Sequence, residues 1–160
     1  MKKFELTSET KINIFGKKLF RIKALISFGD VKAGETGGWV EKEENVNQSG
    51  NAWVYGDAMV SGNAMVSGNA KVYGDAMVSG DAKVSGDADY ATIHGFGTQF
   101  RTTTFFRCKD KKVRVACGCF FGTIPEFREQ VKDTRKGKIA EEYLVISDLM
   151  EKHFEVKSNE

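Results

Sequence analysis

Proline and cysteine are scarce in this chain, and no long hydrophobic run is present. The 160 residues include a single proline and three cysteines. One proline excludes a proline-rich linker, and an odd number of cysteines does not favour a disulfide framework, which agrees with a reducing compartment. No apolar stretch is long enough to cross a membrane, and the N-terminus continues into acidic and polar residues instead of an apolar signal core. We therefore expect a protein of the cytoplasm.

Motifs of the common catalytic chemistries are also scarce. The chain has two histidines, His94 and His153. Its glycine-rich part lacks the Gly-Lys-Ser/Thr sequence of a phosphate loop, and no serine-nucleophile motif is present. The best-known enzymes built from hexapeptide repeats are acyltransferases, which need a histidine base at a cleft between subunits, and His94 is the one weak candidate for that role.

The three cysteines include a spacing that can bind zinc. Cys117 and Cys119 form a Cys-x-Cys pair, and Cys108 lies nine residues before them. However, Cys117 and Cys119 continue the alternation of Val113 and Val115, and a buried cysteine behaves as a small apolar residue. We expect no metal site and no cofactor.

Glycine, in contrast, is plentiful, and it recurs inside a hexapeptide repeat. The repeat is marked by valines six residues apart: Val54, Val60, Val66, Val72, Val78 and Val84. Each valine is followed four positions later by an alanine, with Ser/Tyr-Gly-Asn/Asp between them. Valine favours strands and can point inward, alanine fits a crowded corner, and glycine lets the chain bend there.

Three hexads form one structural unit. Tyr55 recurs as Tyr73 and Met59 recurs as Met77, so the match is closer at a shift of 18 residues than at six. A parallel β-helix of triangular cross-section has this period, because each hexad supplies one flat side and one corner. The sequence therefore predicts a mainly β fold with a short parallel β-helix.

About two coils of clean repeat cannot bury much apolar surface alone. The outward positions carry aromatic and methionine side chains: Trp53, Tyr55, Met59, Met65, Tyr73 and Met77. Exposed apolar stripes usually mark an interface, so we expect self-association, most simply a homotrimer. The alternative is that the flanking segments fold back and cover these stripes within one chain.

The segment before the repeats combines a predicted hairpin with a recognisable string. Apolar residues alternate on both sides of a turn at Gly16, which indicates two strands. The string Asp-Val-Lys-Ala-Gly-x-x-Gly-Gly-Trp-Val follows at Asp30–Val40. With the hexapeptide repeats, this string resembles a family of poorly characterised bacterial and prophage hexapeptide-repeat proteins, over roughly residues 20 to 90. The resemblance implies a left-handed β-helix and a bacterial or bacteriophage origin, hence the host cell cytoplasm for a phage protein.

After the repeats, a basic hairpin is expected. Thr102–Arg107 and Val113–Phe121 read as antiparallel strands joined at Asp110-Lys111. A two-residue turn would pair Arg107 with Arg114 and Lys109 with Lys112 on one face, although like charges opposed across a sheet are destabilising. We therefore predict a site for an acidic protein surface or an anionic ligand, made of Arg101, Phe105, Arg107, Lys109, Lys112 and Arg114. The alternative is a solvated hairpin tip.

The charge is unevenly distributed along the chain. Residues 100–116 contain six Lys or Arg and one Asp, whereas residues 51–89 contain two Lys and five Asp. The net charge of +2 conceals this division. An acidic partner would meet the C-terminal part, and nucleic acid is an unlikely partner because the repeats would repel it.

Two helices are predicted at the C-terminus. Thr123-Ile-Pro-Glu126 forms a capping box with proline in the first turn, which begins a helix that ends near Lys136-Gly137. A second helix carries the stripe Ile139, Tyr143, Ile146 and Met150. The sequence thus predicts N-terminal strands and a cap at 1–48, the β-helix at 49–95 and a ββαα module at 96–160.

These features favour a non-enzymatic, oligomeric binding protein. In a bacterial or phage setting it could bind and block a host protein, including a defence component. One alternative is a hexapeptide-type acyltransferase that uses His94. Another is an oligomer that sequesters an anionic nucleotide with Arg107, Lys109, Lys112 and Arg114.

Overall fold

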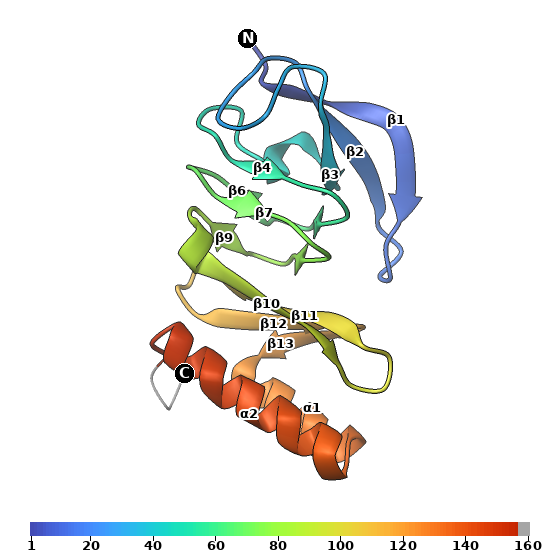
Figure 1. Cartoon of the computed structure of the whole chain (residues 1–160), viewed down its shortest axis with the longest axis vertical. Coiled ribbons are helices and arrows are strands. Elements are labelled where there is room, and N and C mark those ends of the chain that lie inside the picture. The colour runs from blue at the N-terminus through green and yellow to red at the C-terminus, as the bar shows by residue number, and fades with distance from the viewer. Residues whose placement is uncertain (157–160) are drawn as a thin grey trace.

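A computed structural model describes residues 1–156 and arranges them as a column. Figure 1 shows the N-terminal strands at one end, stacked coils in the middle, and a second sheet with two helices at the other end. The N-terminal strands and the C-terminal helices therefore lie at opposite ends of the column. Within the described residues, no helix has the length and apolar character needed to span a membrane.

The coils form from six strands of two residues each. They are β4 (Trp53–Val54), β5 (Met59–Val60), β6 (Met65–Val66), β7 (Lys71–Val72), β8 (Met77–Val78) and β9 (Lys83–Val84). They pair in parallel as β4–β7, β5–β8 and β6–β9, always between residues 18 apart. All six repeat valines are fully buried. The predicted period and the inward position of valine are confirmed.

The corner glycines have the backbone conformation that the repeat requires. Six of them have φ between 56° and 75°, a left-handed region in which other residues are strained. Glycines of successive coils also stack closely, since a Cβ on Gly50 would lie 2.8 Å from the carbonyl oxygen of Gly68.

The pairing extends upstream of the clean repeat. Strand β3 (Thr36–Val40) pairs in parallel with β5, so that Val40 lies beside Val60, and Val46 bridges Val66. These partners are 20 residues apart because the connection between Val46 and Val54 is two residues longer than a hexad. The coils therefore begin within the string that precedes the repeats.

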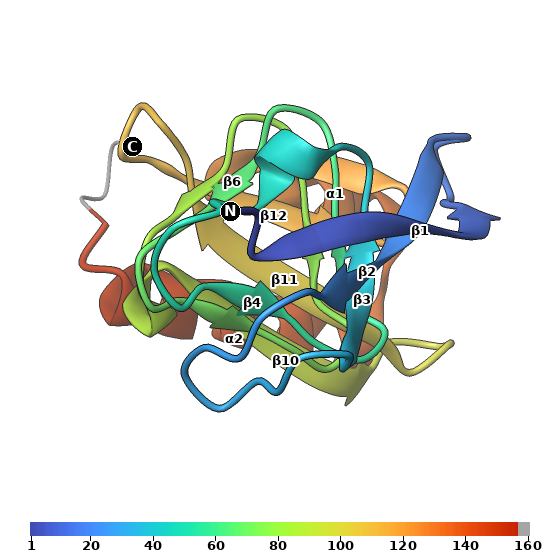
Figure 2. The ribbon, with the colours of Figure 1, turned by 90° about the horizontal axis from the view of Figure 1, so that it is seen from above.

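The N-terminal hairpin covers the first coil. Strands β1 (Phe4–Ile12) and β2 (Lys18–Ala24) are antiparallel, as predicted, and β2 pairs with β3. Figure 2 shows β1 crossing over the coils in the view from above. The ring of Trp53 packs between Phe4 and Phe28, with ring centres 5.8 and 5.2 Å away, and is fully buried. We expected Trp53 to face a partner subunit, and this is wrong because the chain's own N-terminal segment encloses it.

The C-terminal module contains four strands instead of the two predicted. They are β10 (Tyr90–Phe96), β11 (Arg101–Arg107), β12 (Val113–Cys117) and β13 (Phe120–Thr123), antiparallel in this order. Two features conceal them in the sequence. The segment from Tyr90 continues the repeat register, and a turn at Gly118, with φ 58°, divides what reads as one long strand.

The predicted register of the basic hairpin is also wrong. Phe106 pairs with Arg114, and Arg107 pairs with Val113. The loop is longer than two residues, because the Cys108 amide donates to the Lys112 carbonyl and Lys111 has φ 68°. A shift of one residue moves side chains to the opposite face of a sheet, so Arg107 and Arg114 do not share a face.

Both faces of this sheet are covered. Phe106, Cys108 and Ala116 join the core of the coils, whereas Phe105, Val115 and their neighbours pack under the helices. The helices are α1 (Ile124–Thr134) and α2 (Gly137–His153). The capping box of Thr123 and Glu126 is confirmed, and so is the buried stripe of α2, at Tyr143, Ile146 and Met150. The module thus closes the second end of the coils.

Candidate functional site

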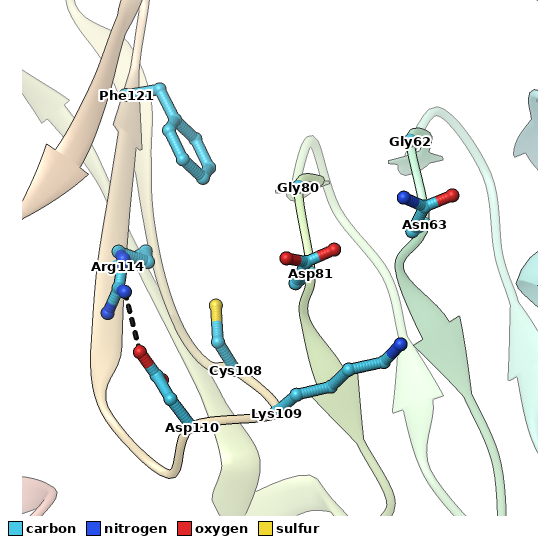
Figure 3. A pocket seen from close by; sticks show the side chains of 9 residues that line it. All are labelled: Gly62, Asn63, Gly80, Asp81, Cys108, Lys109, Asp110, Arg114 and Phe121. Atoms are coloured by element: carbon cyan, nitrogen blue, oxygen red, sulfur yellow. Dashed lines mark hydrogen bonds and ion pairs between the residues drawn. The ribbon is translucent and has the colours of Figure 1, made fainter.

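A cavity of about 460 Å³ lies between the corners of two coils and the hairpin that joins β11 to β12. Each of the two coils contributes a corner glycine and the polar residue that follows it. The module contributes the hairpin and the ring of Phe121 (Figure 3). The lining residues are Gly62, Asn63, Gly80, Asp81, Cys108, Lys109, Asp110, Arg114 and Phe121.

A second, more apolar cavity of about 210 Å³ continues from the first. The two share Gly62, Gly80 and Phe121. The second is also lined by Phe15 and Lys17 from the tip of the β1–β2 hairpin and by two serines of the coil corners. We call the two cavities together the corner groove. It has an aromatic end at Phe15 and Phe121 and a charged end at Lys109 and Arg114.

Backbone contacts fix the charged end of the corner groove. Ala82 and Cys108 form an antiparallel bridge, and the Lys109 amide donates to the Asp81 carbonyl over 3.0 Å. Phe121 presses against Gly80, where a Cβ would come within 2.6 Å of the ring. The hairpin is therefore attached to the last coil, and a side chain at Gly80 would close the groove.

Arg114 is the most unusual group in the groove. One guanidinium nitrogen, Nη2, donates to Asp110 Oδ2 over 2.7 Å, as Figure 3 shows. The other, Nη1, is buried and meets no hydrogen-bond partner among the described residues. The Lys112 amide, helped by the Arg114 guanidinium, lowers the pKa of Asp110, which therefore stays ionised. A buried donor without a partner is costly, so Arg114 has unused capacity for an acceptor.

Cys108 lines this groove with a buried thiol. Burial raises the pKa of its thiol to about 11, which keeps it protonated near neutral pH. Across residues 1–156, no three His, Cys, Asp or Glu side chains are grouped as metal ligands. The groove thus presents charged side chains and aromatic rings that could contact a ligand.

The predicted basic cluster is divided by the fold. Lys109 and Arg114 line the corner groove, and Lys112 is exposed at the hairpin tip. Arg107 lies on the helix side, where its Nε is 3.4 Å from Asp89 Oδ1 and its guanidinium is 5.5 Å from the Phe154 ring.

The two remaining members of the cluster also lie on the helix side. Phe105 is fully buried with its ring centre 6.2 Å from that of Phe127. Arg101 lies at the other end of β11, where Nη2 donates to Gln99 Oε1. Phe105 therefore has no exposed face to offer to a ligand.

Of the groove residues, sequence reasoning predicted only Lys109 and Arg114; those it missed include Phe15, Asp81 and Phe121. Phe15 had a usable signal, because an aromatic residue in a predicted turn is often exposed, and it is 45% exposed in the structure. Phe121 had no such signal, since it was placed inside a strand. Asp81 occupies a repeat position interpreted as scaffold.

His94 lies apart from the groove. It is exposed on β10, and its Nδ1 is 2.7 Å from Thr102 Oγ1. Because a ring nitrogen held in this way fixes the orientation of the imidazole, Nε2 remains directed away from Thr102. The hypothesis of an acyltransferase base at this residue is not tested by the geometry.

The residues expected at a subunit interface are partly covered by the chain itself. Tyr55 and Tyr73 stack with ring centres 5.4 Å apart. Tyr73 and Met65 are exposed, whereas Met59 and Met77 are half-buried. Self-association stays a prediction.

Comparison with known proteins concerns mainly the coils. Residues 52–68 and 70–86 match the family model described as "YdcK Beta solenoid repeat". The chain is also 37% identical over 65 residues to the "Uncharacterized acetyltransferase YdcK" of Escherichia coli (strain K12). That alignment covers 34% of this chain and 19% of the relative. The chain is therefore similar to hexapeptide-type repeat proteins over its coils.

Proposed function

We propose that this chain is a non-enzymatic binding protein that holds an acidic, aromatic-bearing segment of a partner protein in the corner groove. The observation that carries the proposal is the composition of the groove: two exposed rings at one end and the incompletely bonded Arg114 at the other. Such a combination of apolar anchors and a few placed polar groups is typical of binding sites.

The charges around the groove favour an acidic segment. Its lining carries Lys17, Lys109 and Arg114 against Asp81 and Asp110, and Asp110 is already paired with Arg114. Exposed Lys111 and Lys112 extend the positive charge at the hairpin tip. Because Arg114 Nη1 is buried, the guanidinium must turn toward the groove before a carboxylate can reach it; the charge-assisted hydrogen bond then formed is worth about 1.5–3 kcal/mol.

The remaining parts of the proposal concern the setting. The six-residue repeats and the resemblance to prophage repeat proteins favour coils that wind left-handed and a bacterial or phage origin. That the protein blocks a host factor is our proposal by analogy with other small phage proteins that lack catalytic groups. The exposed Met65 and Tyr73 support a homotrimer. The anionic-nucleotide alternative loses its basis, because Arg107 and Arg114 lie on opposite faces of the sheet.

Peptide selection tests the proposed groove directly. Peptides selected on the intact protein from a random display library are expected to combine Asp or Glu with an aromatic residue. Their dissociation constants, measured by fluorescence anisotropy, should rise about tenfold in Arg114→Gln and in Phe121→Ser. Lys83→Gln, which removes an exposed charge from a coil outside the groove, is the matched control. Peptides that bind all three variants like the wild type would contradict the proposal.

Acyl transfer is the second candidate, supported by the name of the Escherichia coli relative and by the fixed orientation of His94. In this reaction His94 Nε2 would take the proton of the acceptor as it attacks the thioester carbonyl, and the donor thiolate would leave. Acetyl-coenzyme A should then raise the melting temperature of the wild type. Thiol release with an amine acceptor, lost in His94→Ala and retained in His153→Ala, would favour this candidate over the first.

A further inference from the structure

A separate cavity of about 220 Å³ lies inside the C-terminal module, on the helix side of the sheet. It is enclosed by the start of β11, the β12–β13 turn, the second half of α1 and one residue of α2. The lining residues are Arg101, Cys117, Cys119, Phe120, Phe127, Gln130, Val131, Thr134, Arg135 and Tyr143. We call it the helix-side pocket; it shares no residue with the corner groove.

The charge of the helix-side pocket has one sign. Its lining includes Arg101 and Arg135 and no Asp or Glu, whereas the corner groove is lined by both basic and acidic residues. Neither arginine forms an ion pair with a carboxylate of residues 1–156. The carbonyl end of α1 contributes about half a negative charge, which two full positive charges exceed. The pocket therefore attracts anions.

The backbone makes room for one of these arginines. Gly118 has φ 58°, and a Cβ there would lie 1.6 Å from Arg101 Nη1. Any other residue at this turn would displace the guanidinium, which now lies against the turn. Arg101 also donates to Gln99 Oε1 from Nη2, so its orientation is fixed at the mouth of the pocket.

The floor of the pocket is aromatic. Phe127 lies 5.4 Å from Phe120 and 5.7 Å from Tyr143, measured between ring centres. Tyr143 is 2% exposed, and burial raises the pKa of its phenol, which keeps the hydroxyl protonated and able to donate. A planar apolar group placed on this floor would have edge and face contacts with three rings.

The size of the pocket limits the ligand. A cavity of about 150 Å³ is enough for benzene, and drug-sized ligands occupy about 300 Å³ or more. At about 220 Å³ the pocket holds one ring with one anionic group, and a whole nucleotide does not fit. We propose that the helix-side pocket binds a single-ring organic anion, with the ring on Phe120 and Phe127 and the carboxylate or phosphate between Arg101 and Arg135.

Cys119 provides a readout inside the pocket. It is the exposed cysteine of the three, and it lines the mouth beside Arg101. A ligand that fills the pocket should slow alkylation of Cys119 by iodoacetamide, which is uncharged and is followed by intact mass. This readout requires neither a known activity nor a known partner.

The experiment compares four probes on the full chain. Phenyl phosphate and benzoate carry a ring and an anion, benzyl alcohol has no charge, and inorganic phosphate has no ring. We expect saturable protection of Cys119 by one or both ring anions, at concentrations about tenfold lower than for the other two probes. The tighter of the two ring anions identifies the preferred anionic group.

Variants separate the pocket from general charge effects. Arg101→Gln and Arg135→Gln should each raise the protecting concentration about tenfold, and Arg101→Lys should retain part of the effect. Lys136→Gln removes an exposed charge next to Arg135 but outside the pocket. This variant should change the protecting concentration less than about twofold. Circular dichroism melting checks that each variant is folded.

Three results would overturn the proposal. The first is equal protection by benzyl alcohol and the ring anions, and the second is equal weakening by Lys136→Gln and Arg135→Gln. The third is the absence of protection by any probe at millimolar concentration. None of these results affects the corner groove, whose test uses Arg114 and Phe121.

Discussion

The core of the coils consists of valine and alanine that recur every six residues, whereas large rings fill both sides of the single sheet in the C-terminal module. In the coils, each side chain stacks on its equivalent 18 residues away, and backbone bonds connect the layers. In the module, Phe106 packs toward the coils and Phe105 toward the helices. In the module, two adjacent phenylalanines thus lie in different cores. In the coils, equivalent residues of successive layers lie in the same kind of environment.

This difference explains where cavities occur. Identical small side chains fill the interior of the coils evenly, and their corners are smooth. The groove appears where an irregular hairpin meets those corners, and the helix-side pocket appears where rings of different size pack between sheet and helices. The two proposed binding sites therefore lie in the module and at its junction with the coils.

The largest expected effect comes from a charge in the core of the coils. Val78→Asp places an unpaired carboxylate at a fully buried position and should lower the free energy of unfolding by about 4 kcal/mol. Met65→Asp, at an exposed position of a similar strand, is the control and should change it by less than about 1 kcal/mol.

Urea unfolding followed by two probes also shows whether the regions unfold together. Both tryptophans, Trp39 and Trp53, report on the N-terminal sheet and coils, and the helical circular dichroism reports on the module. We expect coincident transitions, shifted together in Val78→Asp, because the module shares a core with the coils. If the urea midpoint of the helical signal is unchanged in Val78→Asp, the module unfolds independently of the coils.

A smaller effect is expected at the junction. Gly80→Ala introduces a Cβ at φ 62° that would lie 2.6 Å from the Phe121 ring, and should cost about 3 kcal/mol. Gly74→Ala has a similar φ, 70°, with no atom within 4 Å, and should cost about 1 kcal/mol. Phe121→Ala should remove the difference in a double-mutant cycle. Equal costs in both glycine variants would show that the hairpin does not press on the coil.

At the opposite end, Lys3 should make stability depend on pH. Its Nζ donates to the carbonyls of Gly50 and Ala52, and burial lowers its pKa from 10.5 to about 8. Between these values the unfolded chain binds more protons than the folded one, so the free energy of unfolding should rise with pH, by about 2 kcal/mol from pH 8 to 10. The rise should be absent in Lys3→Met, as measured by urea unfolding. The same slope in both proteins would assign it to other groups.

The smallest perturbation is chemical labelling, which compares two of the three thiols, Cys108 and Cys119. Cys119 should react with iodoacetamide at pH 8, whereas Cys108, buried at the junction with a pKa near 11, should react only after unfolding. Mass spectrometry of peptides identifies the labelled residue. Labelling of Cys108 as fast as Cys119 in the native protein would show that the junction opens, and so would place the coils and module in separate units.

Predictions from the sequence were confirmed where they depended on local or repeated patterns, and were wrong where they depended on a loop length or on contacts between distant segments. The period of 18, the inward valines, the hairpin at Gly16 and the capping box at Thr123 were confirmed, because each depends on residues close in sequence or on a repeat. The basic face of Arg107 and Arg114 was wrong, because one extra residue in the Cys108–Lys112 loop reversed the sidedness of the hairpin. Trp53 was wrong because nothing near it in sequence indicates that Phe4 and Phe28 cover it.

By itself, the sequence determined the coils, since a six-residue pattern of valine, glycine and alanine permits few other packings. It also determined the two helices, through local capping and a stripe of apolar residues. Only the tertiary structure decided which charges share a surface, that the chain covers both ends of its own coils, and where the corner groove and the helix-side pocket form. These properties depend on residues far apart in the chain that line one cavity, such as Phe15 and Phe121 or Arg101 and Arg135, for which no local pattern exists.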